Sequence, residues 1–158
     1  MAIASYTDII SLTRAKNYLR IDDTLTEDNS DIEAMIVAAC EFIEKQTNHI
    51  LKDRNIEVFT GDRCAVTVYD YPINEVITAA NVEVVKWPLK QVFTFDDLDG
   101  EPFIYNAGYT SVDDIPKSLI NAALQMIKVW YYESEKQVNE SLIPLSVTQV
   151  IDTYRRFR

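Results

Sequence analysis

The sequence contains few of the residues on which common catalytic and nucleotide-binding motifs depend. Its 158 residues include three glycines, two cysteines and one histidine. The glycines stand at positions 61, 100 and 108, so they cannot supply the clustered glycines of a P-loop or a dinucleotide fingerprint. His49 follows a predicted helix, where we expect it to contact the terminal carbonyl groups and not to act in catalysis. We therefore predict no catalytic and no cofactor-binding residue.

The cysteines and the acidic residues do not fit a metal site either. Cys40 and Cys64 lack metal-ligand spacing, and we interpret them as two buried thiols in a reducing compartment. The stretch DDLDGE resembles part of a calcium loop, but placing Gly100 at the glycine position puts Phe95 and Asn106 at the first and last ligand positions. The stretch instead favours a turn between two strands.

Positive charge is scarce as well. Fifteen Lys and Arg stand against 25 Asp and Glu, which gives a net charge of −10 and disfavours a broad face that binds phosphates. An acidic wall would still let DNA pass without adhering to it, because like charges repel. The N-terminus has no basic start followed by an apolar run, and no apolar stretch approaches the ~20 residues that span a bilayer. We expect no signal peptide and no membrane partner.

The composition indicates one globular domain with a substantial core, since 47% of the residues are hydrophobic and 25% are charged. A short helix is predicted at 12–19, with Ser11 as its N-cap. A long helix is predicted at 28–46, where apolar residues recur every three or four positions: Ile32, Met35, Ile36, Ala39, Phe42 and Ile43.

Between residues 55 and 110 the hydrophobic period changes to two. Residues 56–60 and 64–69 read as a hairpin around the turn at Gly61, and further strands are predicted at 80–87, 91–95 and 103–105. Pro72 interrupts this run, because proline lacks the donor that a ladder needs. These short strands predict a small antiparallel or barrel-like β insert.

A second long helix is predicted at 116–136. Pro116 suits its first turn, where the missing N–H has no partner within the helix. The run that follows is apolar on nearly every side, which indicates a helix that is buried all round. Its cover comes either from its own chain or from a neighbouring subunit. With this helix at the centre of the fold, Trp130→Ala is expected to cost about 3–5 kcal/mol.

The C-terminal segment differs from the rest of the chain in charge and pattern. Ser146 and Gln149 have the spacing of a capping box. An apolar stripe and a basic end follow: Val147, Val150, Ile151, Tyr154, Arg155, Arg156 and Arg158. A helix of about ten residues is not stable alone, so the stripe must pack on the protein's own body or on a partner.

Several segments resemble the head–tail connector (adaptor) family of tailed bacteriophages. They are the opening AKNYLRID with its acidic loop, the turn YNAGYT leading to Ile115 and Pro116, and the terminal YRRFR. We expect Gly108 in that turn to have a positive φ, a region that only glycine enters freely. The resemblance covers both ends of the chain and leaves residues 79–103 without a counterpart.

The resemblance implies a mainly α fold with a β insert, in which about four helices form a bundle beside a small antiparallel sheet. It implies a ring, usually dodecameric, beneath the portal in the neck of a virion, with assembly in the host cytoplasm. Such a ring extends the channel for double-stranded DNA and docks the next neck, stopper or tail protein. No catalysis is implied.

Two parts of the chain receive roles from this resemblance. Residues 1–144 become the connector body, and residues 145–158 become a C-terminal helix that docks on the portal through its stripe and arginines. Truncation after Pro144 is accordingly expected to leave a folded protein. The acidic loop offers candidate channel-lining residues, for which the alternative is a solvated helix start: Asp22, Asp23, Glu27 and Asp28.

Two other classes of function remain open at the level of the sequence. One is a ligand- or peptide-binding β-barrel module that the helices brace. The other is an enzyme that uses acidic residues such as Asp96, Asp97 and Asp99 for acid–base chemistry.

Overall fold

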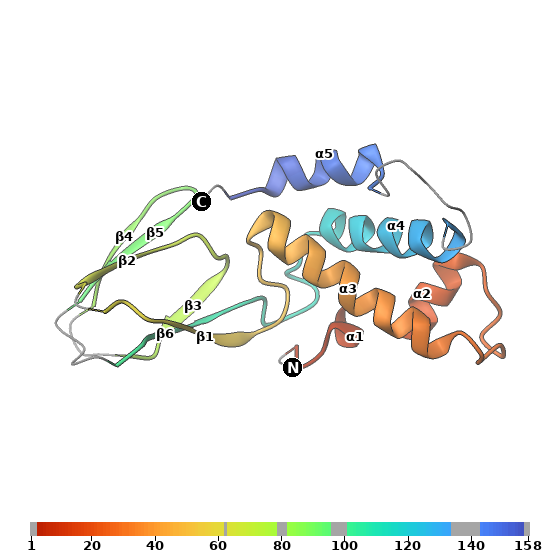
Figure 1. Ribbon diagram of the computed structural model, residues 1–158, viewed down its shortest axis with the longest axis horizontal. Helices are drawn as coiled ribbons and strands as arrows, with labels where there is room; N and C mark the ends of the chain where they lie inside the picture. Colours follow the sequence, from red (N-terminus) through yellow and green to blue (C-terminus); the bar gives the residue numbers. More distant parts are fainter. Residues whose placement is uncertain (1–2, 62, 79–81, 96–100, 134–142, 157–158) are drawn as a thin grey trace.

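The computed structural model describes residues 3–61, 63–78, 82–95, 101–133 and 143–156. The molecule is elongated, with a helical half and a β half placed end to end (Figure 1). The helical half contains the five described helices: α1 (Tyr6–Ile9), α2 (Leu12–Leu19), α3 (Asn29–Thr47), α4 (Lys117–Glu133) and α5 (Leu145–Tyr154). The described residues thus form a mixed α/β fold with five helices. The mainly α fold and the bundle of about four helices that the resemblance implies are not confirmed.

The first two helices begin at serines whose side chains cap them. In α1, Ser5 and Asp8 form a reciprocal capping box, an element that the sequence analysis missed. The Ser11 side chain accepts a hydrogen bond from the Arg14 backbone N–H, so the predicted helix at 12–19 is confirmed with its cap. The helix predicted at 28–46 is α3, shifted by one residue at each end.

Helix α4 occupies the predicted position and lies against α2, α3 and α5. The Pro116 carbonyl accepts from the N–H groups of Leu119 and Ile120, so proline stands immediately before the helix, where its missing donor costs nothing. Residues 134–136, the predicted end of this helix, lie outside the described residues.

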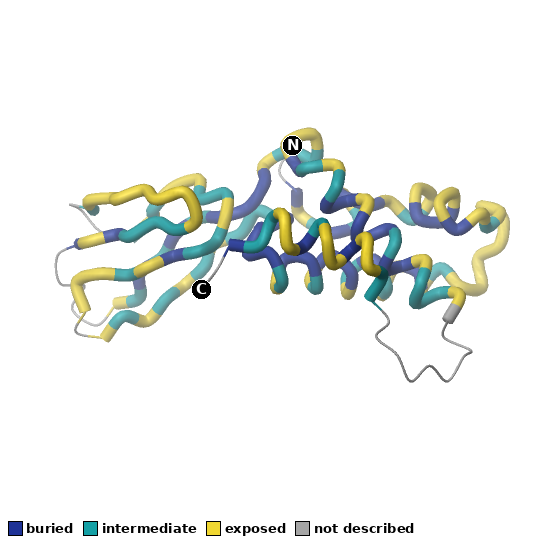
Figure 2. Tube along the Cα trace, turned by 90° about the horizontal axis from the view of Figure 1, so that it is seen from above, coloured by how far each residue is buried: buried dark blue, intermediate teal, exposed yellow. Residues whose placement is uncertain are grey.

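The helical half has its own core. Figure 2 shows that buried residues concentrate where the helices face one another. The fully buried positions of α4 extend over its first three turns: Leu119, Ile120, Ala122, Ala123, Leu124, Met126 and Ile127. Trp130 and Tyr131 are half-buried and Tyr132 is 51% exposed. The apolar residues up to Ile127 are buried as predicted, but Asn121 and Lys128 are exposed on the remaining side of the helix. The prediction of burial on every side is therefore wrong, most clearly at the end of α4.

As far as its residues are described, the β half consists of two three-stranded antiparallel sheets. The first has the order β1 (Arg54–Val58), β6 (Phe103–Ala107), β3 (Ile73–Val76), and the second has the order β2 (Ala65–Val68), β5 (Gln91–Thr94), β4 (Glu83–Lys86). A separate core lies between them, built around Phe93, Phe95, Phe103 and Tyr105. The single small sheet that the sequence predicts is thus two sheets.

The predicted hairpin of residues 56–60 and 64–69 is wrong. Val58 pairs with Phe103 in the first sheet, whereas Val66 pairs with Phe93 in the second. Each strand places its apolar side against the core between the sheets, so the turn at Gly61 carries the chain from one sheet to the other. The turn predicted at residues 99–100 lies outside the described residues.

The predicted conformation of Gly108 is confirmed, since its φ is +126°. A Cβ atom at this position would lie 2.5 Å from the Lys52 carbonyl oxygen and 2.7 Å from Asp53 Cα. The Gly108 N–H donates to the Pro72 carbonyl. Glycine is therefore required both by the backbone conformation and by the close approach of a neighbouring segment at the junction of the two halves.

Candidate assembly interface

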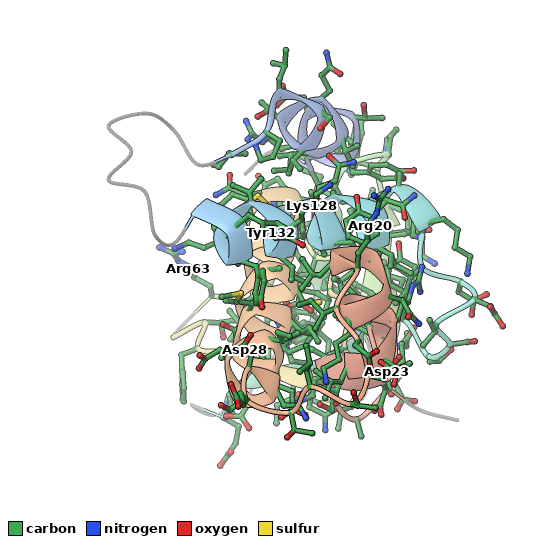
Figure 3. All side chains as sticks on the ribbon, turned by 90° about the vertical axis from the view of Figure 1, so that its right-hand side faces the viewer. Arg20, Asp23, Asp28, Arg63, Lys128 and Tyr132 are labelled. Carbon is green, nitrogen blue, oxygen red and sulfur yellow. The ribbon has the colours of Figure 1, made fainter. Side chains whose placement is uncertain are left out.

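The acidic loop between α2 and α3 lies at the free end of the helical half (Figure 3). Its carboxylates at Asp22, Asp23, Glu27 and Asp28 are all exposed. Asp22 accepts hydrogen bonds from the backbone and the hydroxyl of Thr24, and these bonds lower the pKa of its carboxyl. The loop is therefore shaped by local hydrogen bonds while its charges face solvent.

Contacts from the body hold this loop in place. The buried Lys16 donates from Nζ to the carbonyl oxygens of Asp23 and Leu25. The Tyr131 hydroxyl donates to Asp28 Oδ2 over 2.6 Å. The same end of the molecule also presents Arg20 and Lys128 (Figure 3). The face is thus of mixed charge, a feature that the charge count of the loop alone does not indicate.

Helix α5 packs against α3 and α4 of its own chain. Val147 is fully buried and Ile151 is 3% exposed, and both belong to the main helical core. Val150 and Tyr154 are half-buried. Of the predicted docking stripe, Val147 and Ile151 are therefore not available to a partner in this conformation, because α4 and α3 cover them.

The capping box predicted for this helix is wrong. The helix begins one residue earlier, at Leu145, and Pro144 is its N-cap without a side-chain hydrogen bond. The Ser146 hydroxyl instead donates to Gln125 Oε1 on α4 over 2.5 Å. The serine thus joins two helices where the sequence pattern indicates a local cap.

Arg156 belongs to the interior of the molecule and not to a free basic end. It is 8% exposed, its N–H donates to the Thr47 carbonyl, and its Nε donates to the Leu89 carbonyl over 3.3 Å. Its guanidinium lies 4.6 Å from the centre of the Tyr71 ring, a cation–π distance. Arg155 is partly exposed and pairs with Asp152 at 3.7 Å, and Arg158 lies outside the described residues.

His49 lies between the two halves among three tyrosines. Its Nδ1 is 2.8 Å from the Tyr109 hydroxyl, and its ring lies edge-on to those of Tyr71 and Tyr154. Burial, aided by the charge of Arg156, lowers the pKa of His49 to about 4, while a backbone hydrogen bond to Tyr154 opposes the shift. The histidine thus contacts the end of α5 in addition to following α3, which the sequence does not indicate.

Glu44 joins α1, α3 and β1 through a saturated set of contacts. Its Oε2 accepts from the Tyr6 hydroxyl at 2.9 Å and pairs with Arg54 at 3.0 Å. Its Oε1 accepts from the backbone N–H groups of Leu51 at 2.6 Å and Lys52 at 3.2 Å. Burial and this carboxylate raise the pKa of Tyr6 to about 12. Glu44 therefore has a structural role, because no lone pair of its carboxylate is left to accept a proton as a base.

The remaining candidates for chemistry give no site. Among the described residues, no cluster of His, Cys, Asp and Glu could hold a metal ion. Cys40 is buried, which raises the pKa of its thiol to about 12, but Cys64 is exposed, so the prediction of two buried thiols is wrong for Cys64. Asp96, Asp97 and Asp99 lie outside the described residues. In the described part of the chain, no helix combines the length and apolar character that a membrane span requires.

One surface was missed by the sequence analysis. All four residues of β4 are exposed, and large apolar side chains stand along it and in the turn that follows: Val84, Val85, Trp87 and Leu89. The two-residue hydrophobic period of the sequence predicts a strand here, but it does not predict that the strand lies at the edge of a sheet.

Comparison with known proteins gives a match of fold alone. No protein-family model and no curated protein matches the sequence. A chain in the virion of a native gene transfer agent (GTA) particle superposes with a TM-score of 0.72 at 16% identity, over 100% of this chain and 94% of that one. The neck of an empty GTA particle computed with C6 symmetry gives 0.72, and the neck of a native GTA particle computed with C12 symmetry gives 0.70, at the same identity and coverage. This chain has the fold of that neck component from end to end.

Proposed function

We propose that this chain is a structural adaptor in the neck of a tailed-phage-like particle, where copies form a ring beneath the portal. The observation that carries the proposal is the match over the whole of this chain to a neck component, with 94% of that chain also covered. The ring is expected to be dodecameric, to extend the DNA channel and to dock the next neck, stopper or tail protein, without catalysis.

The charge of the chain supports passage of DNA without binding. The net charge is −10, and a wall with few cations releases few counterions from a double helix and so holds it weakly. We assign the exposed loop carboxylates of Asp22, Asp23, Glu27 and Asp28 to the channel side of the ring. The loop that carries them lies at one end of the elongated subunit. A subunit that points this end toward the axis of the ring would place these carboxylates at the channel.

Docking on the portal is proposed for the outer side of α5. The buried side chains of Val147 and Ile151 fix the helix on the body, which leaves Val150, Tyr154 and Arg155 partly exposed. Arg155 and Arg158 can pair with carboxylates in a two-pronged geometry that lysine cannot form. Helix α5 would thus dock on the portal while it remains packed on α3 and α4, and not as a free arm.

A second candidate function is a small ligand- or peptide-binding module. An open cleft of about 440 Å³ lies between α3 and β1, lined by polar groups that include Glu41, Lys45, Asn48 and Asp70. Its most buried acid, Glu44, is fully engaged. A module of this kind would act without the particle.

Deletion of the coding sequence from the particle-producing genome distinguishes the two functions. An adaptor is required for tail attachment, so we expect filled heads without tails, counted by electron microscopy, and restoration of tailed particles when purified protein is added. Normal numbers of tailed particles from the deleted genome would contradict the proposal. Equal numbers of filled heads with and without the gene serve as the control for packaging.

A further inference from the structure

The β4 edge carries large apolar side chains that lack cover among the described residues. Val85 is 51% exposed, Trp87 is 56% exposed and Leu89 is 47% exposed. In the described residues, β4 pairs with β5 on one side and with no strand on the other. An exposed strand edge presents unpaired N–H and C=O groups in a row, a surface that another strand fits.

The opposite edge of the same sheet is also available. In the described residues, β2 pairs with β5 and with no other strand. Beside this edge lies a cleft of about 270 Å³ between β2 and β1, lined mostly by apolar or small side chains that include Ile56, Val58, Val66 and Thr67. The sheet therefore has an exposed apolar strand at one edge and a partly open groove at the other.

The two edges are in matched register. Ala65 of β2 and Glu83 of β4 both pair with Thr94 of β5, and Val68 and Lys86 both pair with Gln91. Since both strands are antiparallel to β5, they run parallel to each other. A copy of the sheet placed alongside would bring β4 next to the β2 of its neighbour without a shift along the strands.

Symmetry decides which contact is compatible with a ring. A contact between two different edges of the same chain is heterologous, and it closes into a ring when each copy is rotated by a fixed angle. Twelvefold rotation changes the strand direction by at most 30° between neighbours, so β4 and the next β2 remain nearly parallel. A β4–β4 contact would instead be twofold and would end at a dimer.

Charge also favours a second copy of this chain as the partner. In a chain with a net charge of −10, Lys86 ends β4 and Lys90 stands in the turn that follows, near the apolar residues. The groove at the other edge includes the carboxylate of Asp70. Opposite local charges on the two edges reduce the repulsion that two acidic subunits otherwise feel.

We propose that β4 of one copy pairs in parallel with β2 of the next copy, so that the second sheet continues from subunit to subunit. The inference rests on the proposed function, because it names the contact that would hold that ring together. The occupant of the β4 edge is a second copy of this chain. Val84, which shares the core side of the sheet with Phe93, faces the groove of that copy, and Val85 lies beside its Thr67 on the outer side.

A disulfide cross-link tests the register directly. In the variant Cys64→Ser/Ala65→Cys/Glu83→Cys, the two new thiols lie on neighbouring strands of adjacent copies. Within one copy they are separated by β5, roughly 9–10 Å apart, which is too far for a disulfide. Mild oxidation in the presence of filled heads from the deleted genome is expected to convert the monomer band into a ladder of dimers, trimers and higher oligomers.

A matched variant provides the control. Cys64→Ser/Ala65→Cys/Lys86→Cys places the second thiol three residues away, roughly 10 Å along the strand and on the other side of the sheet. It is expected to remain monomeric under the same oxidation. A ladder from this control in place of the first variant would overturn the proposed register.

Two further outcomes separate this inference from the proposed function. If the wild-type protein restores tails to the filled heads but the Cys64→Ser/Ala65→Cys/Glu83→Cys variant gives no ladder, the proposed ring stands and the β4–β2 contact is wrong. If Cys64→Ser/Glu83→Cys alone gives dimers, β4 pairs with itself and the contact is wrong as well. If the wild-type protein does not restore tails, the proposed function itself fails.

Discussion

Gly108 is the residue at which the junction between the two halves is most constrained. Its φ of +126° lies in a region that side chains rarely adopt, and a Cβ would meet the backbone of residues 52 and 53 at 2.5–2.7 Å. Neither conflict can be relieved by moving a flexible side chain, because the atoms that would clash belong to the backbone.

Gly108→Ala is therefore expected to lower the free energy of unfolding by about 2–4 kcal/mol. Gly61→Ala is the matched control, since Gly61 has a φ of +57° and no atom lies within 4 Å of its Cβ position. We expect a loss of only about 1 kcal/mol there. Urea denaturation measures both, and equal losses in the two variants would show that the close approach at Gly108 has no energetic effect.

His49 makes the stability of the junction depend on pH. Its pKa in the folded protein is about 4 and its ordinary value is 6.5, so between these values the unfolded chain binds more protons. The contribution of neutral His49 to the free energy of unfolding is therefore fully present above pH 6.5, and it is lost as the pH falls toward 4. The groups around the ring are Tyr71, Tyr109, Tyr154 and the cation of Arg156.

The predicted loss from this titration is roughly 3 kcal/mol between pH 7 and pH 4. Other acids titrate in the same range, so the comparison is with His49→Gln, which lacks the titrating ring. Urea denaturation at several pH values is expected to give a smaller loss for this variant than for the wild type. Parallel curves for the two proteins would contradict the assignment.

At the level of elements, α4 is central over its first three turns and partly exposed at its end. Met126 is 1% exposed, whereas Trp130 is half-buried. Met126→Ala is expected to cost about 2–5 kcal/mol, because it leaves a cavity. Trp130→Ala is expected to cost about 1–2.5 kcal/mol, less than full burial would give. Thermal or urea unfolding measures the order of the two losses, and a larger loss for Trp130→Ala would indicate that the end of α4 is the better packed part.

Helix α5 contributes to the stability of the body. Val147 and Ile151 each bury a side chain worth roughly 1.5–3 kcal/mol in the core shared with α3 and α4. Truncation after Pro144 is thus expected to destabilise the chain by several kcal/mol, contrary to the expectation from sequence of a folded truncated protein. Circular dichroism during thermal unfolding checks this, and an unchanged midpoint would show that α5 does not belong to the core.

Helices α2 and α3 were predictable because their signals are local. Ser11 as a cap and the spacing of Ile32, Ile36 and Ile43 fix α2 and α3 within a residue, and Gly108 reveals its own conformation. The pairing of the strands was not predictable. Strands β1 and β6 pair although about fifty residues separate them in the sequence, and no local pattern specifies that pairing. The burial of Arg156 was missed for the same reason, since its partners Tyr71 and Leu89 lie far away in the sequence.

At the scale of the whole molecule, the two halves present different surfaces. The helical half ends in a hydrogen-bonded acidic loop, and the β half carries an apolar strand edge and a groove on opposite sides. A subunit with unlike surfaces at its two sides and a distinct end is suited to a ring with a channel. This arrangement, together with the match to a neck component over the full chain, is the basis of the proposed adaptor.

The central claim is that copies of this chain form a ring in the neck, and imaging of that ring tests it most directly. The measurement is electron microscopy, with rotational averaging, of filled heads from the deleted genome after addition of the purified protein. The predicted result is a twelvefold ring beneath the portal with an open central channel. Heads that acquire no ring density, or density without a channel through its centre, would contradict the account.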